Sequence, residues 1–120
     1  MIGYTTVGVK NLDAAKKFYT ELLDADVLVD VGRLAMVGTD MAQPKIAVCE
    51  PFNGEAPSVG NGSMVAFTGG STEGVDKMYD KAISLGATCD GKPGVRIDDV
   101  FYGAYVKDAD GNKLCFFHFL

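Results

Sequence analysis

The order of apolar and polar positions in the first half of the chain predicts one helix among short strands. The segment of residues 3–9 is short and rich in β-branched side chains, which indicates a strand. Residues 11–23 follow as a helix, with Asn11 or Asp13 placed to cap its start. Its apolar face is marked by residues at helical spacing: Leu12, Ala15, Tyr19 and Leu22. Three strands are expected next, at 26–30, 33–38 and 45–50.

The second half of the chain repeats this order of elements. A strand is expected at 64–69, and residues 71–85 predict a helix that stops at Gly86. A weak strand around 87–91 and stronger ones at 100–106 and 113–119 complete the set. Tyr19 and Tyr79, each two residues after a lysine, occupy corresponding helix positions, although two amphipathic helices can share such residues by chance. A tandem repeat of a βαβββ unit is the interpretation that accounts for the whole chain.

The repeat sets the expected domain organisation. Residues 1–120 are interpreted as a single domain, with a first unit at about 1–52 and a second at about 61–120. Residues 50–63 contain Pro and Gly without periodicity and are expected to link the units.

The segment from Asp108 to Asn112 has the spacing of acidic and amide residues that opens a calcium loop. Such a loop also needs Gly at its sixth position and Glu at its twelfth, where this chain has Lys113 and Phe119. The alternative is a hairpin turn in which Gly111 takes a positive φ and Asp110 caps its own turn. We expect the turn.

The strand that follows this turn carries Cys115 and His118, which could suggest a nucleophile and its base. Strand side chains alternate between faces, so these two side chains are expected to point in opposite directions. His118 is the one histidine of the chain, which excludes any metal site built on two or three histidines.

Composition and charge narrow the class of partner. The net charge is −5 and no cluster of Lys and Arg occurs, which argues against nucleic acid and anionic membranes. No apolar segment has the length of a membrane span or the form of a signal peptide, so a cytoplasmic location is expected. The three cysteines are far apart and are expected to be free thiols.

Two segments, VGVKNLDAAKKFYTELL near the start and GAYVKDADGNKLCFF near the end, resemble the vicinal oxygen chelate superfamily, which includes glyoxalase I, bleomycin resistance proteins and extradiol dioxygenases. The resemblance covers nearly the whole chain. It implies an α+β fold of two βαβββ units whose curved mixed sheets form a half-barrel cup, a small-molecule pocket between the sheets, and a homodimer.

The resemblance also implies where a metal would be bound. Metal-using members have a His on the first strand of each half and a Glu on the last strand; these positions fall on Tyr4, near Ser63, and on Cys115. Glyoxalase I-like members add a Glu that Glu50 could match. Because a phenol, a hydroxyl and a thiol replace three expected ligands, we expect neither a metal nor another cofactor.

The resulting hypothesis is metal-free binding of a small organic molecule. Any catalysis would rest on Glu50 or Tyr4 as acid or base. A metal-dependent lyase, isomerase or dioxygenase is the alternative, and an enzymatic activity as such stays open. The residues expected to line the pocket are Tyr4, Thr6, Glu50, Ser63, Phe67, Cys115 and Phe117.

Overall fold

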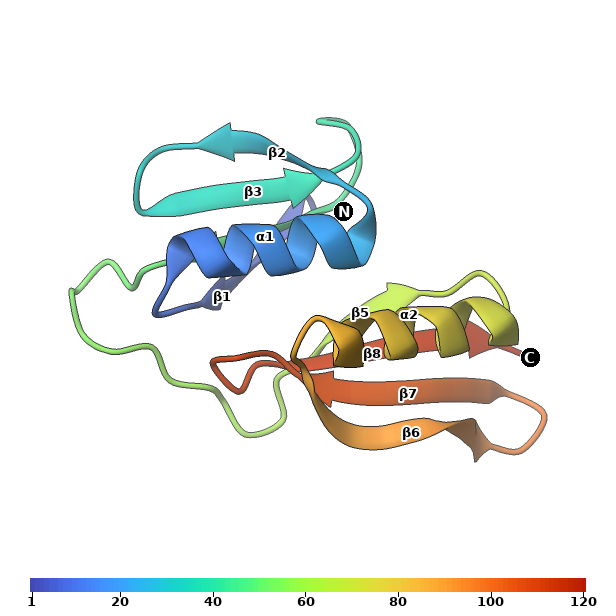
Figure 1. Ribbon diagram of the computed structural model, residues 1–120. Coiled ribbons are helices and arrows are strands. Elements are labelled where there is room, and N and C mark those ends of the chain that lie inside the picture. Colours follow the sequence, from blue (N-terminus) through green and yellow to red (C-terminus); the bar gives the residue numbers. More distant parts are fainter. The chain divides into compact units, whose positions relative to one another are not determined.

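The computed structural model describes residues 1–120, and the chain divides into two compact units, Met1–Val59 and Gly60–Leu120. Each unit contains one helix and one four-stranded mixed sheet in the order βαβββ (Figure 1). The predicted α+β class and the tandem repeat are therefore confirmed. None of the helices is long and apolar enough to cross a membrane.

The first unit has its strands in the order β1-β4-β3-β2, with β1 and β4 parallel and the other pairs antiparallel. The parallel pair arises because α1 connects β1 to the rest of the sheet. The elements are β1 (Tyr4–Gly8), α1 (Leu12–Leu23), β2 (Asp26–Asp30), β3 (Leu34–Gly38) and β4 (Lys45–Cys49).

Helix α1 begins and ends where its local chemistry requires. The side chain of Asn11 accepts a hydrogen bond of 2.9 Å from the backbone N–H of Ala14, and the chain leaves the helix at Asp24 in a left-handed conformation. The helix contacts β3 and β4. All four residues of its predicted apolar face are buried, and so are the sheet residues on the helix side: Ala35, Val37, Ile46 and Val48.

The second unit repeats this arrangement with the strand order β5-β8-β7-β6, and β5 and β8 are the parallel pair. Its β6 runs for ten residues, much longer than the weak strand expected there. The sequence signal for this strand is weak because it contains Gly91, Pro93 and Gly94. These residues are tolerated because β6 is an edge strand with irregular pairing. The elements are β5 (Val65–Thr68), α2 (Thr72–Ser84), β6 (Thr88–Ile97), β7 (Phe101–Lys107) and β8 (Lys113–Phe119).

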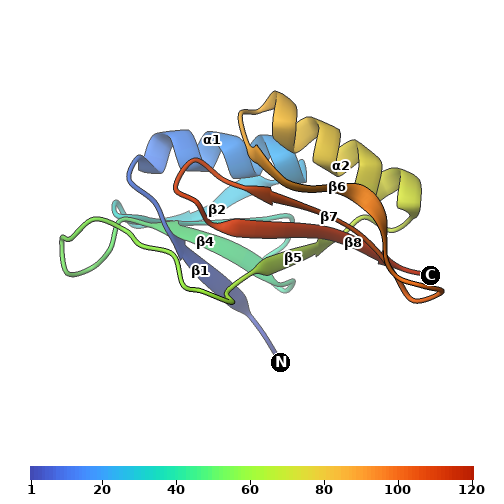
Figure 2. The same ribbon diagram turned by 90° about the horizontal axis from the view of Figure 1, so that it is seen from below.

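Helix α2 is capped by Ser71, whose hydroxyl oxygen accepts a hydrogen bond of 2.9 Å from the N–H of Gly74. Gly86 follows the helix with a φ of +100°, as expected for a glycine stop. The helix contacts β6, β7 and β8 and covers one side of the sheet (Figure 2).

The pairing of β7 with β8 is regular from end to end, so side chains alternate strictly between the two faces of the sheet. Leu114 and Phe116 are fully buried on the side of α2. We call the opposite side of the second sheet the open face, because α2 does not cover it. On β8 it carries Lys113, Cys115, Phe117 and Phe119.

Candidate functional site

The open face of the second sheet carries a cluster of three phenylalanine rings. Phe101 on β7 stacks against Phe117 on β8, with centroids 5.8 Å apart and planes 5° apart. Phe119 meets both rings edge-on, at 5.7 Å from Phe101 and 5.2 Å from Phe117. Such geometries are the favourable ones for aromatic pairs. Phe119 is 64% exposed, so the cluster presents an apolar surface rather than a sealed core.

Two glycines allow aromatic rings to lie across this face. A Cβ added at Gly103 would meet the Phe101 ring at 2.7 Å, and one added at Gly91 would meet the Tyr105 ring at 2.9 Å. Any other residue at these positions would push the rings away from the backbone. The glycines therefore fix the shape of the open face.

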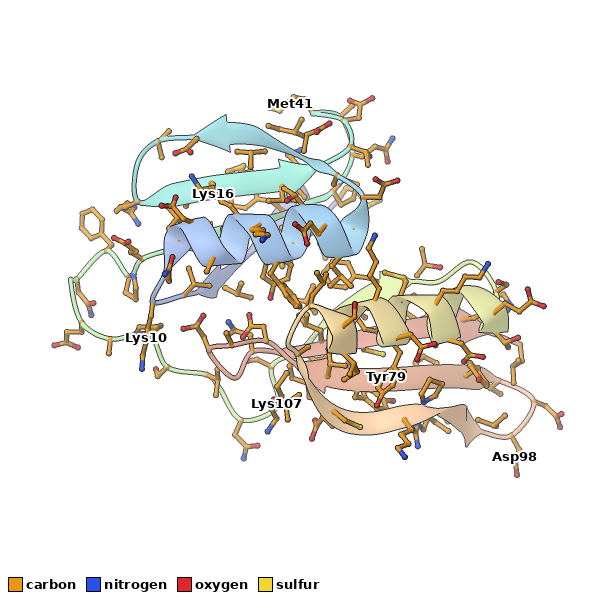
Figure 3. All side chains as sticks on the ribbon, in the orientation of Figure 1. Lys10, Lys16, Met41, Tyr79, Asp98 and Lys107 are labelled. Carbon is orange, nitrogen blue, oxygen red and sulfur yellow. The ribbon has the colours of Figure 1, made fainter.

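Cationic groups gather at the other end of the same face. Tyr105 pairs with Cys115, and its ring lies 5.3 Å from the Arg96 guanidinium carbon and 5.0 Å from the Lys113 ammonium nitrogen. Lys113 also forms an ion pair of 3.4 Å with Asp90. Lys107 occupies the end of β7 and is directly opposite Lys113; it is labelled in Figure 3, as is Asp98 in the turn beyond the other end of the sheet.

Cys115 lies on the open face but is fully buried, and burial raises the pKa of its thiol. Lys113 and Arg96 oppose this rise with their positive charges. His118 pairs with Tyr102 and so lies on the side of α2. The prediction that Cys115 and His118 cannot act together is confirmed, because no bulge interrupts β8.

The segment from Asp108 to Asn112 is a turn, as predicted. One carboxylate oxygen of Asp108 accepts hydrogen bonds of 2.9 Å from the backbone N–H groups of Asp110 and Asn112, and the other accepts one from the Asn112 amide. Gly111 has a φ of +87°. The expectation that Asp110 caps the turn is wrong, because the buried Asp108 does so.

The site residues predicted in the first unit do not form one group. Tyr4 and Thr6 pair with Lys45 and Ala47, and alternation places both on the face away from α1. Glu50 follows the far end of β4, five residues from the partner of Tyr4, which corresponds to roughly 16 Å along the strand. Tyr4 and Glu50 therefore cannot share one proton transfer.

Glu50 is held by its backbone rather than by its carboxylate. Its N–H donates a 2.8 Å hydrogen bond to the carbonyl of Arg33, and the Arg33 guanidinium donates to the Glu50 carbonyl at 3.3 Å. The Arg33 guanidinium also lies 4.9 Å from the ring centroid of the exposed Phe52. These contacts fasten the end of β4 to β3.

The predicted register of the second unit is off by one residue at its start. Phe67 pairs with Phe116 and stacks on its ring, 6.3 Å away, so it lies on the side of α2. The expectation that Phe67 and Phe117 share a face is wrong; Ala66 and Thr68 lie beside Cys115 and Phe117 instead. Ser63 lies before the start of β5, so strand alternation does not place its side chain.

The residues do not suit the metal that the resemblance implies. The matched positions offer a phenol at Tyr4, a hydroxyl at Ser63, a buried thiol at Cys115 and one carboxylate at Glu50. Nowhere do three or more His, Cys, Asp or Glu side chains come together as a cation site. A stable site for zinc, nickel or iron needs at least about three such convergent ligands.

Comparison with known proteins assigns the class. The chain belongs to the Glyoxalase/Bleomycin resistance protein/Dioxygenase superfamily, whose sequence profile matches residues 1–116. It is similar to a glyoxalase/bleomycin resistance protein from Albidiferax ferrireducens, with 33% identity, a TM-score of 0.86 and 98% of each chain covered. A comparison with curated proteins finds no match.

More distant solved structures share the fold. A glyoxalase/bleomycin resistance protein/dioxygenase family enzyme from Burkholderia phytofirmans has 19% identity, a TM-score of 0.83 and 98% of each chain covered. A fosfomycin resistance protein from Listeria monocytogenes, complexed with Mn(II) and 1S,2S-dihydroxypropylphosphonic acid, has 17% identity and a TM-score of 0.76; the match covers 97% of this chain and 87% of that chain.

The sequence analysis missed the cationic half of the open face. Arg96 lies on the irregular strand β6, so periodicity gave no indication of its direction. Lys113 and Tyr105 could have been placed from the alternation that placed Cys115, since all three share a face.

Proposed function

We propose that this protein binds a small organic molecule on the open face of its second sheet, without the metal centre used by metal-dependent members of its superfamily. The observation that carries the proposal is the cluster of Phe101, Phe117 and the exposed Phe119, on the same face as Tyr105 and its two cations. Binding sites for small molecules combine apolar and aromatic walls with a few polar groups that orient the ligand. This face has both within one sheet.

The arrangement of β8 supports this proposal. Leu114 and Phe116 are fully buried on the side of the helix, whereas Phe117 and Phe119 on the other face have ring contacts with each other and with Phe101. Apolar side chains that remain exposed in a group are typical of interaction surfaces. The proposed binding surface consists of Phe101, Tyr105, Phe117 and Phe119.

The donor set at the positions of the family's metal ligands supports metal-free binding. The phenol of Tyr4 and the hydroxyl of Ser63 are weak ligands for a divalent metal, which leaves Cys115 and Glu50, on different units. We therefore assign the ligand's orientation to hydrogen bonds and cations of the chain itself.

The test is a fragment screen by NMR on the complete, isotope-labelled chain. We expect small aromatic compounds to shift the backbone signals of Gly103, Cys115 and Phe117, and Phe117→Ala to weaken binding at least about tenfold. Phe52→Ala is the matched control, because Phe52 is 86% exposed and stacks on Arg33 in the other unit. Equal binding by wild type and Phe117→Ala would refute the proposed surface.

Elemental analysis of the purified protein tests the metal-dependent alternative. We expect well below one nickel, zinc, iron or manganese ion per chain, because about three convergent ligands are missing. About one ion per chain, lost when Cys115 or Glu50 becomes Ala, would replace metal-free binding with the metal-dependent alternative.

We also propose that the protein forms a homodimer, as the sequence analysis expected. Large apolar residues are exposed on both units, among them Ile2, Val31, Phe52 and Ile97. Light scattering at high concentration should give twice the chain mass of 12.7 kDa. A mass of one chain would contradict this.

A further inference from the structure

The charges on the open face are arranged in a way that the fold alone does not require. Lys107 and Lys113 are directly opposite each other on neighbouring strands, a placement in which like charges destabilise a sheet. Arg96 adds a third cation at the same end, over the ring of Tyr105. The chain as a whole has a net charge of −5, so this local cluster of cations is opposite in sign to the net charge.

The carboxylates of the chain do not neutralise this end. Asp90 pairs with Lys113 at 3.4 Å, and both side chains stay partly exposed. No carboxylate lies within ion-pair distance of Arg96, whose guanidinium donates instead to the backbone carbonyl of Lys92. Two cations therefore lie beside one aromatic ring with a single carboxylate, which pairs with Lys113, and an anion would balance the remaining positive charge.

The aromatic cluster lies at the right distance to contact the rest of such a ligand. Phe117 follows Cys115, the partner of Tyr105, by two residues on β8, which is about 7 Å along a strand. Phe101 lies four residues from Tyr105 on β7, or about 13 Å. A molecule with an acidic group and one ring or short apolar chain spans this range.

We propose that the ligand of the open face is an organic oxyanion, whose carboxylate, phosphonate or phosphate binds Arg96 and Lys113 while its apolar body contacts Phe101 and Phe117. This inference rests on the proposed function and adds the chemical class of the ligand. A guanidinium and an ammonium that lie 5.3 Å and 5.0 Å from the same ring are suited to an oxyanion, because each supplies several N–H donors and a positive charge. The Tyr105 ring contacts both cations.

Gly91 couples the cations to the shape of the face. A Cβ at this position would approach the Tyr105 ring at 2.9 Å and the Arg96 guanidinium nitrogen at 3.2 Å. Gly91→Ala should therefore displace both groups while leaving every charge in place. We expect this substitution to weaken oxyanion binding severalfold without changing the charge of the chain.

The experiment compares three probes, two acids and one uncharged alcohol. Phenylphosphonate carries the anion and the ring, phenylacetate carries a carboxylate, and benzyl alcohol has the ring without the charge. Titrations by NMR on the complete chain should show at least about tenfold tighter binding of phenylphosphonate or phenylacetate than of benzyl alcohol. The better of the two acids identifies the preferred oxyanion.

Charge variants then locate the anion. The double substitution Arg96→Gln with Lys113→Gln should weaken binding of the better acid at least about tenfold and leave benzyl alcohol unchanged. The matched control is Lys77→Gln with Lys81→Gln, which removes the same charge from exposed positions of α2. Equal losses in the two double variants would show that only the overall charge matters and would overturn the inference.

Thermal unfolding separates a binding role from a structural one. Because Lys113 faces Lys107, we expect the Arg96/Lys113 double variant to keep a Tm within about 2 °C of wild type. A large fall in Tm would mean that these cations hold the sheet together, and would overturn the inference. If benzyl alcohol binds as tightly as the acids, the oxyanion inference fails while the proposed surface stands; if no probe binds at millimolar concentration, both fail.

Discussion

The hydroxyl of Tyr102 on β7 donates a 2.7 Å hydrogen bond to a carboxylate oxygen of Asp76 on α2. This bond links the helix to the sheet on the side opposite the open face. Tyr102→Phe keeps the ring and removes the donor, so we expect it to lower the free energy of unfolding by about 1 kcal/mol. Denaturant unfolding of both proteins measures the difference. An unchanged midpoint would show that the hydrogen bond makes no net contribution to the free energy of unfolding.

The same hydrogen bond predicts an alkaline dependence of stability. The bond to Asp76, together with partial burial, raises the pKa of Tyr102 above its ordinary value of about 10. A group whose pKa is raised by folding stabilises the protein fully below the unfolded pKa and loses that effect as pH rises through the folded pKa. The advantage of wild type over Tyr102→Phe should therefore be constant from about pH 7 to 9 and shrink above about pH 10. A stability difference between wild type and Tyr102→Phe that grows with pH would contradict this prediction.

The turn before β8 predicts the effect of removing Asp108. Asp108→Ala leaves three N–H donors of a partly buried turn without their acceptor, which should cost about 2–3 kcal/mol of stability. Asp98→Ala removes the same charge from an exposed turn and is the control. Calcium at millimolar concentration should leave the Tm of wild type unchanged within about 1 °C, because the Asp108 oxygens are already occupied by donors. A clear rise in Tm with calcium would reinstate a cation site.

The three thiols should differ in reactivity. Cys89 is exposed, Cys49 is half-buried and Cys115 is buried with a raised pKa. A disulfide reagent at neutral pH should therefore modify Cys89 first and Cys115 only when the protein unfolds, because the thiolate is the reactive form. Cys89→Ser should remove the fast phase and Cys115→Ser should not. The reverse result would mean that the open face exposes Cys115.

The same substitution at two phenylalanines of β8 should lower stability by very different amounts. Phe116 is fully buried and stacks on Phe67, so Phe116→Ala should cost about 3–5 kcal/mol. Phe119 is 64% exposed, and Phe119→Ala should cost less than about 1 kcal/mol. Calorimetry of the two variants measures both effects. Similar losses would mean that the aromatic cluster is part of the core.

The fold could be predicted from the sequence because its signals are local. The cap at Asn11, one of the two residues expected there, and the glycine stop after α2 each act within a few residues of where they occur, and the structure has both. Strand β6 was underestimated for the opposite reason. Its pairing with β7 shifts register three times, so its length depends on a neighbour that period counting does not include.

The candidate site was harder to predict because one residue of register decides which face a side chain occupies. The expected register held for Cys115 and Phe117 on the long, regular β8. It failed for Phe67 on the four-residue β5, whose start the sequence did not mark. The contact of Arg96 with Tyr105 crosses a bulged edge strand and leaves no trace in local spacing.

Because side chains alternate strictly along β8, one side of the strand packs against α2 and the other forms part of the open face. Leu114 and Phe116 decide whether the helix stays attached, while Lys113, Phe117 and Phe119 have little part in that attachment. Mutations at the second group can change what the protein recognises at small cost to folding, since neighbouring positions on opposite sides of a sheet share few contacts. A strand of this kind lets descendants of one ancestor diverge in chemistry while inheriting the same architecture.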